Sequence, residues 1–340
     1  MSKGDCPHQA SAQAQPNIAL IKYWGKRDEA LNLPAVGSLS ITLDHLRTQT
    51  TLRFVPGQRG DRIVLNGKDD VRDAARISRF LDLLRRQRAV DWGAHVVSDN
   101  NFPTAAGLAS SASGFAALAL AAAAALDLPC TPSELSALAR RGSGSAARSI
   151  FGGFVEWAHG MAADGADSIA HALYPPEHWP LRVVIATTST SAKAVGSTEG
   201  MRRTARTSPF QPVWIDSQKA DLEAARQAIH ARDFEALAEI SEHSCLKMHA
   251  LATAARPGLV YWNGATLDAL HAVRSLRGQG VPVFFTIDAG PQLKAVCLPD
   301  AAARVADTLR SIPGVLEVLE CGLGGGARVI PPPDGVFETP

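Results

Sequence analysis

Residues 101–118 read NFPTAAGLASSASGFAAL, and an alanine-rich run continues from there to Leu126. The small residues between Pro103 and Gly114 let backbone N–H groups approach an anion closely, and a helix that follows directly adds the positive end of its dipole. The GxxxxGK[ST] pattern of P-loop proteins is absent from this stretch. Two interpretations fit the residues: a phosphate-binding loop, in which Ser110 and Ser111 also help to hold a metal ion, or a plain turn before a buried helix.

The segments on either side of this stretch predict a mixture of strands and helices. A capping box at Thr131 starts a helix that ends near Gly142. Apolar patterns predict strands at 17–23, within 38–54, and at 95–98, 183–188, 281–287 and 293–298. They predict helices within 71–88 and at about 216–231, 233–255, 265–278 and 300–311. Because strands and helices mix without regular alternation, the sequence indicates the α+β class.

The order of these patterns also suggests a division of the chain. Residues 1–15 are polar and read as a flexible arm. The proline-rich stretch at 174–180 is the best candidate for a domain junction. We therefore expect an amino-terminal lobe over 16–180 that carries the glycine-rich stretch, and a carboxyl-terminal lobe over 181–340.

Composition excludes several classes of protein. The chain has 340 residues, of which 46% are hydrophobic, so a packed core is expected, and the formal net charge of +1 creates no overall field toward nucleic acid or an anionic membrane. The apolar run from Phe115 to Leu126 is shorter than the roughly 20 residues that span a bilayer. The five cysteines form no CxxC pair or Cys/His cluster, which predicts reduced thiols in a cytoplasmic protein. We expect a small-molecule partner, with no nucleic acid and no membrane.

Two basic segments could supply local charge for an anion. KYWGKRD at 22–28 places two lysines and an arginine after an apolar strand, which indicates either a loop that presents cations or a solvated strand end. RGSGSAAR at 141–148 combines two serines with arginines whose forked side chains can grip a phosphate. The alternative for the second segment is a flexible linker, although it leads directly into the apolar pair Ile150-Phe151.

One carboxylate is well placed for chemistry. Asp288 ends an apolar strand and precedes a Gly-Pro turn, which suits the rim of a cleft, although such residues are more often turn formers. The ten histidines are dispersed, and His243 and His249 fit one long helix better than a metal site.

Together these segments resemble one family. NIALIKYWGKRDEALNLPAVGSLSITL (17–43), NFPTAAGLASSASGFAAL (101–118), RRGSGSAARSIFGGFVEW (140–157) and DAGP (288–291) are similar, in this order, to motifs of the diphosphomevalonate decarboxylases, within the GHMP kinase superfamily. The resemblance covers residues 17 to about 298. It implies a two-lobed GHMP kinase-like fold, with a ribosomal protein S5 domain 2-like amino-terminal lobe and a ferredoxin-like carboxyl-terminal lobe. It also implies a homodimer, and ATP and Mg²⁺ as requirements for decarboxylating mevalonate diphosphate.

The resemblance also implies roles for individual residues. Asp288, Lys22 and Arg148 would be catalytic, with Asp288 acting on the 3-hydroxyl proton or orienting that oxygen, and Lys22 contacting both Asp288 and the substrate carboxylate. The substrate-binding residues would be Tyr23, Lys26, Ser143, Ser145, Arg148, Ser197 and Met201, with Lys193 as a further cation. The ATP phosphates would be held by Pro103, Ala105, Gly107, Leu108, Ala109, Ser110 and Ser111, and the metal by Ser110 and Ser111. Ser98, Asn100 and residues 72–79 would lie near the adenine by position alone.

Two departures from the family pattern and three alternatives stay open at this point. Gln292 follows DAGP where the family usually has asparagine, and Ala35-Val36 stand where polar residues are common, which would affect the rim of the site. The chain could instead act on mevalonate monophosphate, phosphorylate the 3-hydroxyl and stop, or bind a metabolite without catalysis. The presence of Lys22, Arg148 and Asp288 together favours the decarboxylase.

Overall fold

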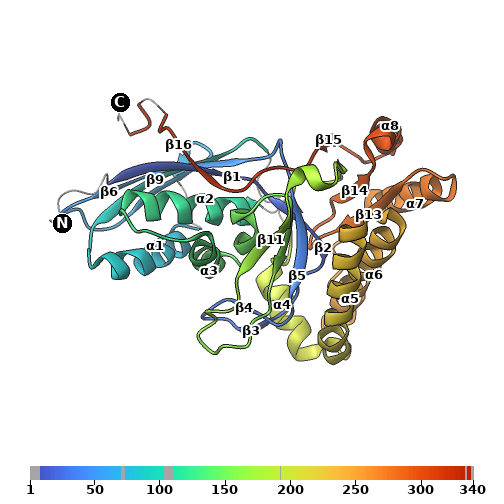
Figure 1. The fold of residues 1–340 in the computed structure, drawn as a ribbon, viewed down its shortest axis with the longest axis horizontal. Helices are drawn as coiled ribbons and strands as arrows, with labels where there is room; N and C mark the ends of the chain where they lie inside the picture. Colours follow the sequence, from blue (N-terminus) through green and yellow to red (C-terminus); the bar gives the residue numbers. More distant parts are fainter. Residues whose placement is uncertain (1–7, 70–72, 103–109, 192, 334, 338–340) are drawn as a thin grey trace.

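A six-stranded sheet contains strands from both the amino-terminal and the carboxyl-terminal parts of the chain (Figure 1). The computed structural model describes residues 8–69, 73–102, 110–191, 193–333 and 335–337. In spatial order the strands are β16 (Arg328–Ile330), β1 (Gln9–Ala14), β6 (Thr48–Val55), β9 (Gly93–Asn100), β7 (Arg62–Leu65) and β8 (Lys68–Asp69). All neighbours are antiparallel except β7 and β9, which run parallel. This sheet positions the helix that begins at Ser110, because that helix packs on β1 and β6.

The predicted arm over residues 1–15 is wrong for residues 9–14, which form β1. This strand pairs antiparallel with β6, from Gln9 opposite Arg53 to Ala14 opposite Thr48. Ala12 and Ala14 are buried against the helical layer. The error has a physical cause: the strand consists of small and polar residues, and only pairing with two distant segments satisfies its backbone groups. Residues 1–7 lie outside the described part of the chain.

Three helices cover one face of this sheet: α1 (Ala74–Arg88), α2 (Ser110–Ala125) and α3 (Pro132–Gly142). The alanines of α2 are buried almost all round, and this absence of bulk lets the helix pack closely on β1 and β6. The predicted capping box at Thr131 is confirmed, since its side chain accepts a hydrogen bond from the Glu134 amide while Glu134 bonds back. Ser111, in the first turn of α2, lines a cavity of the molecule.

A second, four-stranded sheet stands next to these helices. Its order is β11 (Ala170–Tyr174), β10 (Phe154–Trp157), β5 (Ser38–Thr42) and β2 (Asn17–Ile21). The 3₁₀ helix η1 (Gly144–Ile150) joins α3 to β10, and the hairpin of β3 (Lys26–Asp28) and β4 (Leu33–Pro34) follows β2. Every residue of β2 and β5 is buried, so packing fixes this side of the sheet.

The carboxyl-terminal part is built on a third sheet, with helices packed against it (Figure 1). Its order is β13 (Val283–Ile287), β14 (Leu293–Cys297), β12 (Arg182–Thr187) and β15 (Glu317–Cys321). The helical elements are η2 (Pro176–His178), α4 (Ser197–Thr207), α5 (Gln211–Ala231), α6 (Phe234–Thr253), α7 (Gly264–Gly278), η3 (Pro299–Ala301) and α8 (Ala302–Arg310). The patterns predicted α5 to α8 to within a few residues, except that α5 begins five residues earlier. They did not predict α4, which has few apolar residues to mark it.

The two parts of the chain share a hydrophobic core. Leu20 and Ile41 of the second sheet pack in one cluster with Ile185, Phe284 and Val296 of the third. One part of the predicted division is wrong: β16 returns to the first sheet, so residues 328–330 do not belong with the carboxyl-terminal sheet. The α+β class is confirmed. The shared core fixes the end of β2 against the end of β13, where the candidate site lies.

Candidate active site

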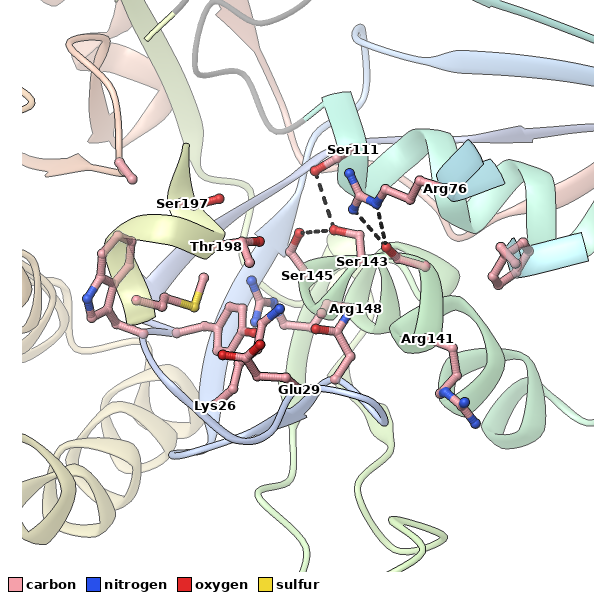
Figure 2. Close-up of a pocket in the computed structure, with 18 of the residues that line it drawn as sticks. Lys26, Glu29, Arg76, Ser111, Arg141, Ser143, Ser145, Arg148, Ser197 and Thr198 are labelled. Carbon is pink, nitrogen blue, oxygen red and sulfur yellow. Dashed lines mark hydrogen bonds between the residues drawn. The ribbon is translucent and has the colours of Figure 1, made fainter. Parts of the chain in front are cut away.

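A cavity of about 750 Å³ lies where the two parts of the chain meet (Figure 2). It brings together segments as far apart in sequence as Lys22 and Asp288. Its lining includes Lys22, Tyr23, Lys26, Ser111, Ser143, Ser145, Arg148, Lys193, Ser197, Met201 and Asp288. The structure therefore gathers around one cavity all the residues predicted for catalysis and for substrate binding.

Asp288 is held by two lysines. Lys22 Nζ donates to Asp288 Oδ1 at 2.7 Å, and Lys294 Nζ donates to Oδ2 at 3.1 Å. Both lysine side chains are 1% exposed, whereas that of Asp288 is 27% exposed and faces the cavity. Burial by itself raises the pKa of Asp288, but the charges of both lysines and their hydrogen bonds outweigh it and hold the pKa below its usual range. Asp288 is thus an ionised carboxylate.

The backbone around Lys22 explains why its side chain reaches Asp288. Its amide donates to Ser244 Oγ at 3.0 Å, and its carbonyl accepts from Gln218 Nε2 at 2.9 Å. These partners lie on α6 and α5, so hydrogen bonds from two carboxyl-terminal helices fix the backbone at Lys22, directly after the end of β2. The predicted contact between Lys22 and Asp288 is present.

Arg148 lies on η1 with neutral partners. Its Nε donates to Asn17 Oδ1 at 3.1 Å, its Nη1 donates to Ser38 Oγ, and the guanidinium lies 5.9 Å from the centroid of the Trp157 ring. Burial lowers the pKa of Arg148 to about 10, with Asp288 and Tyr23 opposing the shift, so the group stays charged at neutral pH. Within the described residues no carboxylate lies within 4.0 Å of it. A buried cation without a carboxylate partner is well suited to bind an anionic ligand.

Three hydroxyls form a row above Arg148 in Figure 2. Ser143 Oγ donates to Ser111 Oγ at 3.3 Å and lies 3.4 Å from Ser145 Oγ. Ser111 belongs to the first turn of α2, so the helix dipole adds positive potential beside the row. Gly144 is required between the serines, because a Cβ there would lie 2.7 Å from the Tyr23 hydroxyl. The row suits a phosphate group.

Tyr23 contributes a buried hydroxyl that no described residue satisfies. Its ring packs edge-on against Trp157 at 4.8 Å, and burial raises its pKa, with Arg148 opposing the shift, so the hydroxyl stays protonated. A buried donor without a partner costs free energy. The hydroxyl is therefore available to a ligand in the cavity.

The remaining predicted substrate residues come from two further segments. Lys26 lies on β3, and burial lowers its pKa. Ser197 and Met201 lie in the first two turns of α4, and Met201 packs in a cluster with Trp24. Lys193 Nζ donates to the carbonyl of Ala289 at 2.6 Å, directly beside Asp288.

The predicted phosphate loop is only partly described. Pro103, Ala105, Gly107, Leu108 and Ala109 lie outside the described residues. Ser110 and Ser111 are described, and they line a second cavity of about 120 Å³ together with Ser98, Asn100 and Arg76. This cavity adjoins the first at Ser111.

The metal prediction can be tested against the donor set. Over the described ranges no group of three or more His, Cys, Asp or Glu side chains could hold a metal ion. Mg²⁺ commonly binds through one or two protein oxygens together with phosphate oxygens and water. The hydroxyls of Ser110 and Ser111, at the start of α2, fit such a site when a nucleotide brings its phosphates.

Sequence reasoning missed Lys294, and it included Arg76 only within residues 72–79, which were placed near the adenine by position alone. Lys294 is the one charged residue in the apolar stretch Leu293 to Leu298, and that isolation was the available signal. Arg76 donates from Nε and Nη2 to the carbonyl of Gly142, at 3.1 and 2.7 Å, which fixes the junction of α3 and η1. Its position on α1 gave no such signal, because that helix carries many arginines.

The two departures from the family pattern fall on structural positions. Val36 is buried beside Trp24 and Trp214 and does not line the cavity, so the expectation that it alters the rim is wrong for this residue. Gln292 Oε1 accepts from the Thr188 amide and its Nε2 donates to the Ser189 carbonyl, both at 2.6 Å. The Gln292 side chain thus ties down two successive residues of the loop after β12.

Replacing Gln292 with alanine should lower the free energy of unfolding by about 2 kcal/mol, since the buried Thr188 amide and the partly buried Ser189 carbonyl lose their partners. Chemical denaturation monitored by tryptophan fluorescence measures the change. Gln227→Ala is the control, because Gln227 is exposed and bonds only the side chain of Glu223 at 3.0 Å. Equal losses for the two variants would show that the two hydrogen bonds of Gln292 contribute nothing.

Comparisons with known proteins agree with this geometry. Residues 14–170 match the family model for the diphosphomevalonate decarboxylase-like N-terminal domain. Residues 183–318 match the model for the mevalonate 5-diphosphate decarboxylase C-terminal domain. The diphosphomevalonate decarboxylase of Ganoderma lucidum is 43% identical over 307 residues, which cover 84% of this chain and 77% of the relative.

Solved structures give the same result. The mevalonate diphosphate decarboxylase of Staphylococcus aureus matches with a TM-score of 0.90 at 38% identity, over 95% of this chain and 98% of that one. A structure described as MDDEF in complex with MVAPP, AMPPCP and magnesium matches with a TM-score of 0.89 at 40% identity, over 95% and 98% of the two chains. These matches confirm the GHMP kinase-like fold that the resemblance implied.

No helix among the described residues is both long and apolar enough to cross a membrane. The match to the first domain model ends at residue 170 and the match to the second begins at residue 183, and residues from both matches line the cavity with its lysine-bound aspartate. This chain belongs to the diphosphomevalonate decarboxylase family.

Proposed function

We propose that this chain converts mevalonate 5-diphosphate and ATP to isopentenyl diphosphate, CO₂, ADP and phosphate, the decarboxylation step of the mevalonate pathway of isoprenoid biosynthesis. The observation that carries the proposal is the ion pair of Lys22 and Asp288, 2.7 Å long, at the floor of a cavity that Arg148 also lines. Phosphoryl transfer alone needs the phosphate-binding elements, whereas decarboxylation also needs cations for the substrate's carboxylate.

The balance of charge immediately around Asp288 supports this substrate. Lys22, Lys193, Lys294 and Arg148 all interact electrostatically with Asp288, which is one carboxylate among four cations. Buried charges that exceed their partners destabilise a protein until an anion binds. A ligand with both a carboxylate and a diphosphate would neutralise this excess.

Different residues bind the two charged ends of the substrate. Lys22 and Arg148 hold the carboxylate, while Tyr23, Lys26, Ser143, Ser145 and Ser197 hold the diphosphate, with Met201 packing beside it. Asp288 faces the tertiary carbon: it orients the 3-hydroxyl for phosphorylation, and its negative charge then stabilises the positive charge that develops as phosphate leaves. The bond between carbon 2 and the tertiary carbon gains the electron pair released by the departing carboxylate.

ATP supplies the phosphoryl group that turns the 3-hydroxyl into a leaving group, and Mg²⁺ neutralises charge on the phosphates. The match to a structure in complex with AMPPCP and magnesium supports both requirements. Ser110 and Ser111, at the start of α2, would hold the metal and the phosphates when the nucleotide is bound. Ser98 and Asn100, beside the smaller cavity, are the candidates for the adenine end.

We also propose that the protein works in the cytoplasm as a homodimer. The described cysteines are free thiols, which suits a reducing compartment. Exposed apolar side chains at Phe210 and Val213 on the start of α5 offer a surface for a second copy. Light scattering of the purified protein measures its molar mass, and so tests the proposed homodimer independently of activity.

A substrate comparison tests the proposed reaction. The protein is incubated with ATP, Mg²⁺ and either mevalonate 5-phosphate or mevalonate 5-diphosphate, and ADP is followed over time. We expect turnover with the diphosphate and far less with the monophosphate. Preference for the monophosphate would indicate a phosphomevalonate decarboxylase, and no ADP with either would identify a binding protein without catalysis.

A further inference from the structure

Lys294 is a buried cation at a position where the strand pattern calls for an apolar residue. It lies in the middle of β14, an interior strand paired with β13 and β12, and it is 0% exposed. Leu293, Ala295, Val296 and Cys297 around it are all buried and apolar. Burying a lysine in this place costs free energy unless the ammonium group is paired.

The partner of Lys294 is the carboxylate at the centre of the candidate site. Its Nζ donates to Asp288 Oδ2 at 3.1 Å, while Lys22 Nζ donates to Oδ1 at 2.7 Å. The two lysines come from different sheets, one from the end of β2 and one from β14. The carboxylate therefore cannot rotate about its Cβ–Cγ bond without breaking one of the two hydrogen bonds.

We propose that Lys294 is a positioning residue, which fixes Oδ2 of Asp288 and keeps this carboxylate ionised and aimed at the cavity throughout turnover. The inference rests on the proposed function, because it gives Lys294 a task only if Asp288 takes part in the reaction. Lys294 does not line the cavity, so it acts through Asp288 and not on the substrate.

The titratable groups around Asp288 determine how its charge depends on Lys294. The groups that face it are Lys22, Arg148, Lys193, Cys245, His249 and Lys294. Burial lowers the pKa of His249 to about 3 and raises that of the Cys245 thiol, so both are neutral near pH 7. Lys22 and Lys294 donate hydrogen bonds to the carboxylate, and loss of either raises the pKa of Asp288. Protonation of Asp288 would then begin at a higher pH.

Lys294→Met should lower kcat by about 100-fold, the scale expected when a reacting group loses its fixed position. The KM for ATP should change little, because the nucleotide phosphates bind at Ser110 and Ser111. The acid limb of the pH profile of kcat should move to higher pH, because Asp288 becomes easier to protonate. A purely structural lysine would lower stability without moving this limb.

A double-mutant cycle tests whether Lys294 acts through Asp288. Single-turnover rates are compared for wild type, Lys294→Met, Asp288→Asn and the double variant. We expect Lys294→Met to have no further effect once Asp288 is asparagine. An equal loss in both backgrounds would overturn the role of Lys294. Near-normal rates for Asp288→Asn alone would overturn the proposed function itself, so the two failures can be told apart.

Arg85→Met is the matched control for stability. Arg85 is a largely buried cation paired with Asp61, with side chains 11% and 4% exposed, and also with Asp82 at 2.8 Å, and Arg85 itself lines neither cavity. Its loss should lower the melting temperature and leave the pH profile unchanged. If Lys294→Met does not fold, Lys294→Gln retains a hydrogen-bond donor without the charge, and the same shift of the acid limb is expected. An unshifted limb in a folded Lys294 variant would contradict the proposal.

Discussion

Asp288→Ala is expected to lower kcat by roughly 1,000-fold or more while nucleotide binding persists. The carboxylate is ionised and fixed by Lys22 and Lys294, and it faces the cavity from the end of β13. Loss of a group that orients a reacting oxygen and stabilises developing charge costs about 10²–10⁴ in rate. Steady-state turnover and the binding of a fluorescent ATP analogue measure the two quantities separately.

The control for this variant is a second buried ion pair. Asp61→Ala removes a carboxylate that is bound to Arg85 and lies away from both cavities. It should lower the free energy of unfolding by about 3 kcal/mol, as loss of one partner of a buried pair does, and leave kcat near normal. If Asp288→Ala turned over as fast as Asp61→Ala, the assignment of Asp288 would be wrong.

Arg148→Gln is expected to lower kcat/KM for the organic substrate by about 100- to 1,000-fold. The guanidinium is buried and makes its hydrogen bonds to Asn17 and Ser38, both neutral, so its charge is available to the substrate. Removing one partner of a buried, hydrogen-bonded charge pair costs about 2–5 kcal/mol. Initial rates at varied substrate concentration measure the effect.

Arg140 provides a matched control for Arg148. It is also a buried arginine, its pKa is likewise lowered to about 10 by burial, and its side chain donates to the backbone carbonyls of Gly165 and Ser168. It does not line the cavity. Arg140→Gln should lower the melting temperature without a comparable loss of kcat/KM. Similar kinetic losses for both variants would mean that burial, and not the site, explains the effect of Arg148.

The site residues that could be predicted are those in contiguous motifs. Lys22, Arg148 and Asp288 each stand in a segment with an unusual mixture of charge, small residues and apolar neighbours, and the resemblance supplied their relation to one another. Residue patterns alone could not bring Lys22 to Asp288, because that contact depends on how β2 packs against β13. The structure supplied this contact through the shared core of the two sheets.

Residues without a local pattern could not be predicted. β1 is a strand only because β6 and β16 flank it, and its alanines fit only beneath the alanine-rich α2. α4 has few apolar positions, so periodicity did not reveal it. The sequence shows Lys294 as the one charged residue in an apolar strand. Its role depends on the hydrogen bond to Asp288, which lies six positions earlier, across the turn between β13 and β14. Each of these depends on tertiary contacts that the local sequence does not encode.

We infer that this cavity couples phosphoryl transfer to decarboxylation. The most direct test is to let the wild-type protein consume a limited amount of mevalonate 5-diphosphate with excess ATP and Mg²⁺, and to measure released CO₂ and ADP in the same sample. We expect equal amounts of CO₂ and ADP, because each phosphorylated substrate molecule goes on to lose its carboxylate. ADP formed without CO₂ would contradict this inference, because the protein would then be a kinase that stops at the 3-phosphorylated product.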